Sequence, residues 1–342
     1  MVSRAAQSTL PPWTIWQRRP FPDTNLLLIA GREPALVDSG FIGHAKQTVA
    51  WASAHGRRTR WVVNTHWHSD HVGANALLQA MGAAIAASTP DADALARRDP
   101  GCCQAEYLDQ PVSPYVVDMS LEDNAILRLG DCDWQVIRTP GHTPGHLCLW
   151  QPDERLLVTG DALSDYDVGW VNLALDGPDA AETALTSLHR MTDLRPRVLL
   201  PAHGPIPSDA SAALAAARRR AQRLIDDPEN AVWYGARRIF AFALMIHDGI
   251  AVNAVESYLH KRLWLVDAAR LLRTTPEAFA AELIEAMLAS SAIVCRNGLL
   301  YAAAEYTPVE MLPVSVPFPR SWPPRGELYR EAVPAKLKDQ AD

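Results

Sequence analysis

Cysteine is scarce in this sequence, and the few cysteines are not arranged in pairs. The 342 residues include five cysteines, an odd number, and no CxxC motif. The first residues also lack the apolar core of a secretory signal peptide. Because such a set of thiols is typical of a reducing compartment, we expect a cytoplasmic protein.

Long apolar runs and an excess of basic charge are missing as well. The longest uninterrupted apolar run covers residues 239–246, far short of the roughly 20 residues that span a bilayer. The 32 Lys and Arg stand against 39 Asp and Glu, and the net charge of −7 gives no general attraction to phosphate backbones or anionic lipid. We therefore expect no membrane span and no nucleic acid partner, and we expect a small-molecule substrate.

Short apolar stretches alternate with helical patterns in the first part of the chain. We expect strands near residues 25–31, 34–40, 60–64, 83–88, 125–130, 133–140, 146–151, 155–163 and 197–204. Helical patterns end near residue 54 and recur at 72–81, 89–99 and 180–191. This alternation predicts a layered α/β domain over residues 1–206.

The pattern of the sequence changes after residue 206. Residues 209–227 and 231–246 are long helical stretches rich in Ala, Arg and Leu. Between residues 266 and 304, a short helix, a Thr-Thr-Pro turn, a second helix and a hairpin turned at Arg296-Asn297-Gly298 predict a winged-helix-like arrangement. We therefore expect a helical, winged-helix-like domain over residues 207–306 and a proline-rich tail over residues 307–342.

Residues 64–75, NTHWHSDHVGAN, crowd ligand-type side chains into one turn. In an extended segment side chains alternate faces, so His66 and His68 point the same way and can bind one cation. Asp70 and His71 begin a helix, and this change of backbone direction aims them at a neighbouring point. The stretch predicts two adjacent metal sites; the alternative is a helix cap among ordinary surface histidines.

Three more ligand candidates each follow an expected strand. His142 lies in TPGHTPGH, Asp161 in LLVTGDAL and His203 in LLPAHGP. A turn after a strand lets a side chain emerge at the edge of the sheet, where active sites of layered α/β proteins lie. Each turn alone is more often structural, but finding all three in order after the histidine cluster favours one shared site.

One ordered pattern joins these side chains: H-x-H-x-D-H, followed by a histidine, an aspartate and a last histidine. It resembles the metallo-β-lactamase superfamily over about residues 12–206, which implies an αββα sandwich with a two-metal site at one edge. By this resemblance the first metal would be bound by His66, His68 and His142, and the second by Asp70, His71 and His203, with Asp161 bridging both. The resemblance also makes Asp70 and Asp161 the catalytic carboxylates.

Within the superfamily, an aspartate at the bridging position resembles glyoxalase II, the acyl-homoserine lactonases and other esterase-like or phosphodiesterase-like members. The lactonases usually carry a tyrosine three residues after it, where this chain has Ser164. The resemblance implies hydrolysis of an ester, thioester or lactone by hydroxide held between two divalent ions; zinc suits this ligand set, and iron or manganese also fit it. Two alternatives stay open: a mononuclear-iron sulfur dioxygenase, and a phosphodiesterase or nuclease of the same superfamily.

The sequence contains no side chain arranged as a covalent nucleophile. It has no GxSxG motif, and Cys102, Cys103 and Cys148 have no evident paired base. We therefore expect water to attack the substrate directly, without an acyl-enzyme.

Two residues near the expected ligands have two interpretations each. His146, four residues after His142, either orients a ligand or is a polar residue on the following strand. Asp38 either braces the metal site or forms a turn.

The loop after the bridging aspartate is the expected substrate pocket. It offers Tyr166, Trp170 and Asn172, although Trp170 could also belong to the core. Tyr234 and Arg237 lie on the helical extension, where a packing or solvated role is favoured over substrate contact.

The charge of the winged-helix-like region opposes binding of DNA or RNA. Residues 245–304 contain five basic and six acidic residues, and acidic residues lie in the expected recognition helix. We expect this region to cover the active site or to build an oligomer interface, such as that of a homodimer.

Overall fold

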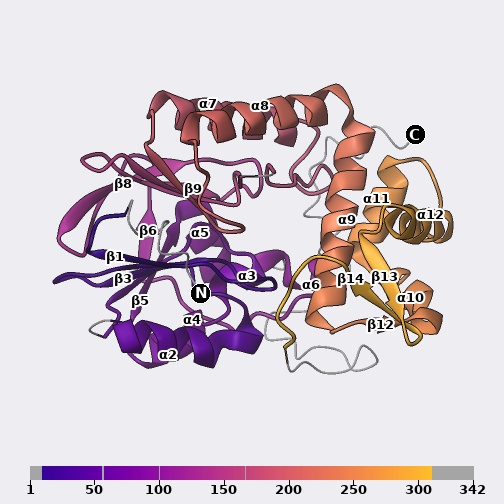
Figure 1. Ribbon diagram of the computed structural model, residues 1–342, viewed down its shortest axis with the longest axis horizontal. Coiled ribbons are helices and arrows are strands. Elements are labelled where there is room, and N and C mark those ends of the chain that lie inside the picture. The colour runs from indigo at the N-terminus through magenta and orange to yellow at the C-terminus, as the bar shows by residue number, and fades with distance from the viewer. Residues whose placement is uncertain (1–9, 56–57, 100, 166, 310–342) are drawn as a thin grey trace.

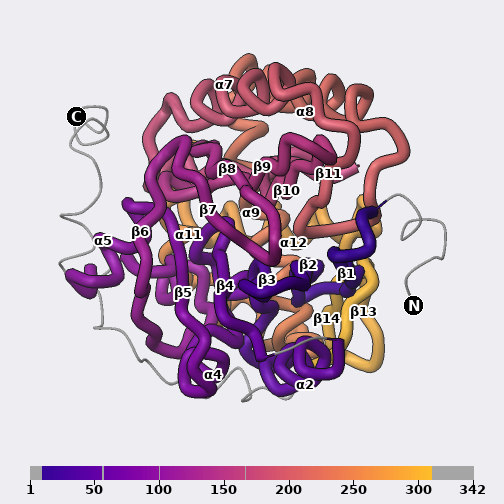
Figure 2. The backbone as a smooth tube through the Cα atoms, turned by 90° about the vertical axis from the view of Figure 1, so that its left-hand side faces the viewer, coloured from indigo at the N-terminus to yellow at the C-terminus, as the bar shows by residue number. Residues whose placement is uncertain are grey.

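The computed structural model describes residues 10–55, 58–99, 101–165 and 167–309. Within these ranges, two mixed β-sheets face each other and helices cover the outer face of each sheet (Figure 1). Figure 2 shows the layers from another side, with α7 (Ala180–Asp193) and α8 (Ala210–Asp226) on one outer face and α2 (Ala45–His55) and α4 (Asn75–Ala80) on the other. This arrangement confirms the expected αββα sandwich.

The first sheet has six strands that lie in chain order. They are β1 (Thr14–Gln17), β2 (Leu26–Ile29), β3 (Ala35–Val37), β4 (Trp61–Val63), β5 (Ala84–Ser88) and β6 (Met119–Leu121). Strands β3, β4 and β5 run parallel, with Val63 opposite both Val37 and Ala86. The chain therefore leaves β4 in the interior of the sheet, between two neighbouring strands.

The second sheet has five strands in the order β11-β10-β9-β8-β7. They are β7 (Ile126–Leu129), β8 (Cys132–Arg138), β9 (Leu147–Gln151), β10 (Leu156–Gly160) and β11 (Val198–Pro201). β10 and β11 are parallel, with Val158 opposite Leu200, so their carboxyl ends lie at the same edge. Side chains such as Trp134, Val136 and Leu149 pack against the first sheet and form the core between the layers.

Two edge strands of the first sheet were not expected from the sequence. β1 has four residues and β6 has three. Among the residues that the structure describes, each of these strands pairs with a single neighbour, and a segment this short shows little periodicity. Pairing with the adjacent strand, rather than the local pattern, makes these segments extended.

Shorter helices connect the strands of the sandwich. They are η1 (Ile42–His44), α3 (Ser69–Val72), α5 (Thr89–Arg97), η2 (Cys102–Gln104) and α6 (Ala105–Leu108). α5 begins at a Ser88 cap, whose side chain accepts a hydrogen bond from the Asp91 amide, and has Pro90 in its first turn. No helix in the described ranges is both long enough and apolar enough to cross a bilayer.

The C-terminal elements pack against the open end of the sandwich, on the right in Figure 1. They are α9 (Pro228–Ile246), β12 (Ile250–Ala251), α10 (Val252–Leu259), α11 (Leu263–Leu271), α12 (Pro276–Ala289), β13 (Ile293–Arg296) and β14 (Leu299–Ala302). Phe240, Trp264 and Phe279 lie in one core cluster that also includes Tyr107 and Leu108 of the sandwich domain. The two parts of the chain therefore share buried apolar surface.

The expected helix, turn, second helix and hairpin are present as α11, α12, β13 and β14. Asn297 and Gly298 have φ angles of 50° and 77°, the positive values that a tight hairpin turn requires. The winged-helix interpretation itself stays a prediction, as do the boundaries at residues 206 and 306. Most of the proline-rich tail, from residue 310, lies outside the described residues.

Candidate metal centre

The histidine-rich turn follows β4 directly and ends in helix α3. His68 has extended backbone angles and caps α3, and Asp70 and His71 lie in the helix. All four candidate ligands of this turn are buried, His66 and His71 almost completely. The chain therefore changes direction between His68 and Asp70, as the sequence predicted.

The other three candidates come from turns of the second sheet. His142 lies in the turn between β8 and β9, Asp161 directly follows β10, and His203 lies two residues beyond β11. Because β10 and β11 are parallel neighbours, Asp161 and His203 emerge at the same edge of the sheet. The fold brings all seven predicted ligands together.

The seven side chains form overlapping groups whose ligand atoms lie within 4.8 Å of one another. We call His66, His68 and His142 the first group, and Asp70, His71 and His203 the second group. In the first group, His68 Nδ1 lies 3.0 Å from both His66 Nε2 and His142 Nε2. In the second, His203 Nε2 lies 3.2 Å from Asp70 Oδ2. Each group can hold one metal ion.

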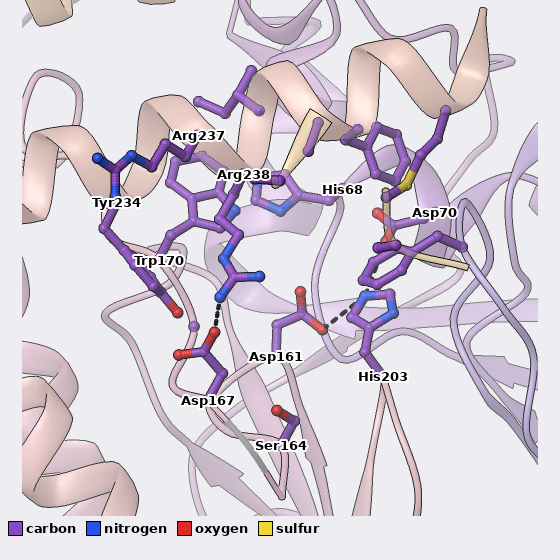
Figure 3. A pocket seen from close by; sticks show the side chains of 18 of the residues that line it. His68, Asp70, Asp161, Ser164, Asp167, Trp170, His203, Tyr234, Arg237 and Arg238 are labelled. Carbon is purple, nitrogen blue, oxygen red and sulfur yellow. Dashed lines mark hydrogen bonds and ion pairs between the residues drawn. The ribbon is translucent and has the colours of Figure 1, made fainter. Parts of the chain in front are cut away.

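Asp161 lies between the two groups and offers one oxygen to each. Its Oδ2 atom is 3.5 Å from His142 Nε2 of the first group. Its Oδ1 atom is 3.4 Å from His71 Nε2 and 3.5 Å from His203 Nε2, both of the second group. This is the geometry that a carboxylate shared by two neighbouring cations requires. Figure 3 shows Asp161 directed toward His203.

Several buried polar atoms of the site have no hydrogen-bond partner among the described residues. They include His68 Nε2, and also His71 Nε2 and Asp161 Oδ1, which lie 3.4 Å apart as an ion pair without forming a hydrogen bond. A buried polar atom without a partner is costly, and native proteins avoid this state. Metal ions would satisfy these atoms, and imidazole with carboxylate is a donor set that divalent transition metals bind. The residues present therefore fit a metal centre.

Burial keeps the first group neutral. The pKa of His68 falls to about 3, because its imidazole is buried and lies beside His142. Burial also lowers the pKa of His66 and of His142. All three imidazoles are therefore uncharged at neutral pH and offer lone pairs to a cation.

Carboxylates and imidazoles lie close together in and beside the second group, and each shifts the pKa of the other. Burial alone would lower the pKa of His203, but Asp161 and Asp70 outweigh it and raise this pKa to about 9. Burial alone would raise the pKa of Asp161, but His203 and His71 hold it well below its ordinary value. Without a metal ion, protons on the imidazoles compensate the negative charge of the carboxylates. A bound cation would replace these protons.

Asp38 stabilises the histidine-rich turn through hydrogen bonds from Thr65 and His71. Its carboxylate accepts hydrogen bonds from the amide and hydroxyl of Thr65, at 2.8 and 2.9 Å, and from His71 Nδ1 at 2.9 Å. Asp38 itself has a φ of 56°, a strained value for a residue with a side chain. The bond to His71 directs the opposite ring nitrogen into the site.

Two further contacts orient ligands. His142 Nδ1 donates to the carbonyl of Trp170 at 2.7 Å, which leaves its Nε2 lone pair facing the first group. The backbone amide of Asp161 donates to His146 Nε2 at 3.1 Å, while His146 Nδ1 lies 2.8 Å from the Thr139 hydroxyl. His146 therefore positions the segment that carries Asp161 and does not face the cation groups with a free nitrogen.

A pocket of about 630 Å³ opens beside these groups. Its lining includes His68, Asp70, Asp161 and His203, together with residues of α9 and of the loop that follows β10. Figure 3 shows α9 crossing above the site, with the labelled Arg237 and Arg238 on it. A substrate in this pocket would contact both the sandwich and the C-terminal region.

The three residues that the sequence predicted to contact substrate have three different outcomes in the structure. Trp170 lines the pocket and stacks on His68, with ring centroids 5.7 Å apart and planes at 6°. Asn172 is not among the residues lining that pocket; its side chain accepts hydrogen bonds from the amides of Ala174 and Leu175 and so stabilises the loop itself. Tyr166 lies outside the described residues.

Residues far from the motifs also reach the site. Phe21 stacks on His203, with ring centroids 4.5 Å apart. Tyr234 and Arg237, for which the sequence favoured packing or solvation, line the pocket, and so does Arg238. No local sequence signal identifies these residues, because only the packing of distant segments brings them there.

The chain is similar to curated proteins over about half of its length. It is 37% identical over 153 residues to hydroxyacylglutathione hydrolase of Anaeromyxobacter dehalogenans, covering 44% of this chain and 50% of that protein. It is 29% identical over 194 residues to the beta-lactamase-like protein 2 homolog of Caenorhabditis elegans, covering 53% of this chain and 55% of that protein. The chain thus spans about half the length of these two relatives.

Solved structures resemble this fold over a larger part of the chain. A metallo-beta-lactamase family protein of Thermus thermophilus matches with a TM-score of 0.52 and 22% identity, covering 85% of this chain and 99% of that chain. A beta-lactamase domain protein of Burkholderia ambifaria matches with a TM-score of 0.50 and 18% identity, covering 86% of this chain and 94% of that chain. At such identities the likeness shows the fold alone, and it extends into the C-terminal region.

A protein-family model described as the metallo-beta-lactamase superfamily matches residues 19–203. The matched region begins after β1 and ends at His203, so it contains the six side chains of the two groups and also Asp161. With more than half of the sequence matched and the αββα fold in place, this chain belongs to the metallo-beta-lactamase superfamily.

Proposed function

We propose that this protein is a metal-dependent hydrolase that cleaves a carboxylic ester, a thioester or a lactone. The observation that carries this proposal is the position of Asp161, which offers one oxygen to each group of ligands. Seven ligand side chains are more than one tetrahedral site can use. This arrangement supports a centre of two divalent ions.

The residues of the two groups would hold one ion each. His66, His68 and His142 would bind the first, Asp70, His71 and His203 the second, and Asp161 both. Zinc suits the imidazole and carboxylate donors, and iron or manganese would fit the same set. When bound, such a pair supplies an activated water at neutral pH and a positive charge that polarises a carbonyl.

The chain's own residues would prepare this chemistry. Asp38 and the Trp170 carbonyl fix the ring orientations of His71 and His142. The ring of Phe21 stacks on His203 and the ring of Trp170 stacks on His68, and these contacts would hold both imidazoles in place. Ligands held in this way need little rearrangement during the reaction.

The cysteines support direct attack by water. Cys102, Cys103 and Cys148 are buried, and burial raises the pKa of the Cys148 thiol to about 12. A thiol in this state is a poor nucleophile. None of the three lines the pocket beside the metal groups.

The curated relatives support the choice of a carbonyl substrate. The name of the Anaeromyxobacter dehalogenans protein states that it hydrolyses hydroxyacylglutathione, which is a thioester. Because the two chains match over only part of their lengths, this likeness supports the type of bond and not the identity of the substrate.

Metal analysis combined with a substrate panel tests the proposal. We expect about two divalent ions per chain and hydrolysis of at least one member of an ester, thioester and lactone panel. Chelation should abolish the activity and added metal should restore it, and rapid-quench kinetics should show no burst of leaving group. One iron per chain with oxygen consumption, selective cleavage of phosphodiesters, or a trapped acyl adduct would contradict the proposal.

A further inference from the structure

One face of α9 forms a wall of the pocket, and this face is cationic in one part and apolar in the other. Tyr234, Arg237 and Arg238 line the pocket from the N-terminal part of this face, and Ala241, Phe242 and Met245 line it from the C-terminal part. Their spacing of three and four residues places them on one side of the helix. At 1.5 Å per residue, this face is roughly 16 Å long.

The C-terminal half of this wall is apolar, and apolar side chains of other elements line the same pocket. Met287 of α12 and Leu108 of α6 line the same pocket and are buried. The ring of Phe21 lies 6.5 Å from that of Phe242 and 4.5 Å from that of His203. The apolar end of the pocket therefore begins beside the second ligand group.

The N-terminal half of the wall is cationic. Arg238 forms an ion pair with Asp167 of the facing loop. Arg237 is exposed and lies over the ring of Trp233, with its guanidinium carbon 5.3 Å from the ring centroid. In the part of the chain that the structure describes, Arg237 has no carboxylate in ion-pair contact. It is therefore available to an anion that enters the pocket.

The candidate metal centre lies between these two ends. In Figure 3, Arg237 and Tyr234 lie on one side of Trp170, and Asp161, His203 and Asp70 lie on the other side. A molecule that spans the pocket would therefore have its reacting bond between a charged end and an apolar end.

We infer that the substrate is amphipathic: an ester or thioester with an anionic group that binds Arg237 and an apolar chain that lies against Phe242, Met245 and Met287. A guanidinium binds carboxylate or phosphate through paired hydrogen bonds, and methionines accept flexible chains. This inference rests on the proposed hydrolase function, because it places the scissile carbonyl beside Asp161.

Kinetics with matched thioesters test the anionic contact. The panel contains two anionic thioesters. S-octanoyl mercaptopropionate carries its carboxylate on the thiol side of the carbonyl, and the S-octyl monothioester of glutarate carries it on the acyl side. Each anionic thioester is compared with a neutral counterpart. We expect the metal-loaded protein to favour the anionic member of at least one pair by about tenfold or more in kcat/KM. Arg237→Ala should abolish this preference, Arg237→Lys should retain part of it, and rising salt should weaken it.

The matched control is Arg219→Ala, which removes the same charge from an exposed position on α8 outside the pocket lining. This variant should keep the preference. Equal rates for charged and neutral members in both pairs, or a preference that survives in Arg237→Ala, would overturn the inference. If the protein hydrolyses no ester, thioester or lactone at all, the proposed function is refuted, and the binding measurement alone then tests the inference.

Binding is measured by calorimetry with octyl sulfonate and ethyl sulfonate in chelator-treated protein, where the anion has no metal to bind. We expect octyl sulfonate to bind more tightly than ethyl sulfonate, and Arg237→Ala, but not Arg219→Ala, to weaken its binding about tenfold. Binding that is independent of chain length or of Arg237 would contradict an amphipathic substrate.

Discussion

Asp161 connects the two ligand groups, although it lies in a short turn after β10. Its carboxylate reaches His142 through one oxygen and His71 and His203 through the other. The amide of the same residue is held by His146. The side chain of Asp161 therefore contacts both ligand groups, and its backbone amide is held in position by a hydrogen bond.

Replacing Asp161 by Ala should reduce metal loading at limiting free zinc from about two ions per chain to about one, because the shared ligand is lost. Asp161→Asn keeps the volume but removes the charge, and should bind the second ion weakly. Equilibrium dialysis followed by elemental analysis measures the stoichiometry, and circular dichroism checks the fold. Asp153→Ala, at an exposed turn, serves as the control. Full loading of Asp161→Ala at wild-type affinity would refute the bridging role.

Asp91 is a second buried carboxyl group with an unusual pKa, away from the proposed ligands. It is 2% exposed, and its Oδ2 atom has no hydrogen-bond partner within the described residues. Burial raises its pKa from an ordinary 3.8 to about 8. The folded protein therefore keeps a proton that the unfolded chain releases above about pH 4.

This pKa predicts that Asp91 lowers the free energy of unfolding as pH rises from about 4 to about 8, and has a constant effect above that. Asp91→Asn should match the wild type near pH 4 and exceed its stability at pH 8 by an amount on the order of a few kcal/mol. Urea unfolding of both proteins at several pH values, with chelator present, measures the difference. A difference that does not change with pH would show that Asp91 is ionised in the fold.

At the scale of elements, α9 joins the C-terminal region to the loop beside the metal centre. The hydroxyl of Tyr234 donates to the carbonyl of Val168 at 2.6 Å. Two residues later, the carbonyl of Trp170 accepts the hydrogen bond that orients His142. One helix therefore supports the loop that positions a proposed ligand and lines the pocket.

Tyr234→Phe should loosen this loop. We expect a several-fold increase in KM for the substrates that the panel identifies, with a smaller change in kcat and a loss of about 1 kcal/mol in stability. Tyr301→Phe, on β14 and outside the pocket lining, is the control. Steady-state kinetics and urea unfolding provide both measurements. An unchanged KM for every substrate would show that the loop keeps its position without this hydrogen bond.

At the scale of the whole molecule, the C-terminal region adds a wall to the pocket of the sandwich. The shared apolar cluster of Tyr107 and Leu108 with Phe240 and Trp264 attaches it to the first part of the chain. This attachment agrees with the expected covering of the active site. A homodimer interface on the same region stays a prediction.

The charge of this region predicts weak interaction with nucleic acids. Residues 245–304 carry a net charge of −1 from five basic and six acidic side chains. Because phosphate contacts supply most non-specific affinity, we expect no tight binding of DNA or RNA at physiological salt. Fluorescence anisotropy with mixed DNA and RNA checks this, and sub-micromolar affinity that falls steeply with salt would contradict it.

The sequence by itself determined the strands of the sandwich interior and the seven candidate ligands. Residues 64–75 combine a strand end and a helix start, and Asp161 and His203 each follow a buried apolar strand. These signals are local, because period and turn residues act over a few positions. For this reason the order of elements and the candidate site could be predicted without a structure.

Only the tertiary structure decided which residues surround the site. It placed Phe21 on His203, stacked Trp170 on His68, left Asn172 inside its own loop and turned one face of α9 toward the pocket. The short edge strands β1 and β6 also depend on their neighbours. Such contacts join segments far apart in the chain, and their energy comes from packing and pairing, which no local pattern records.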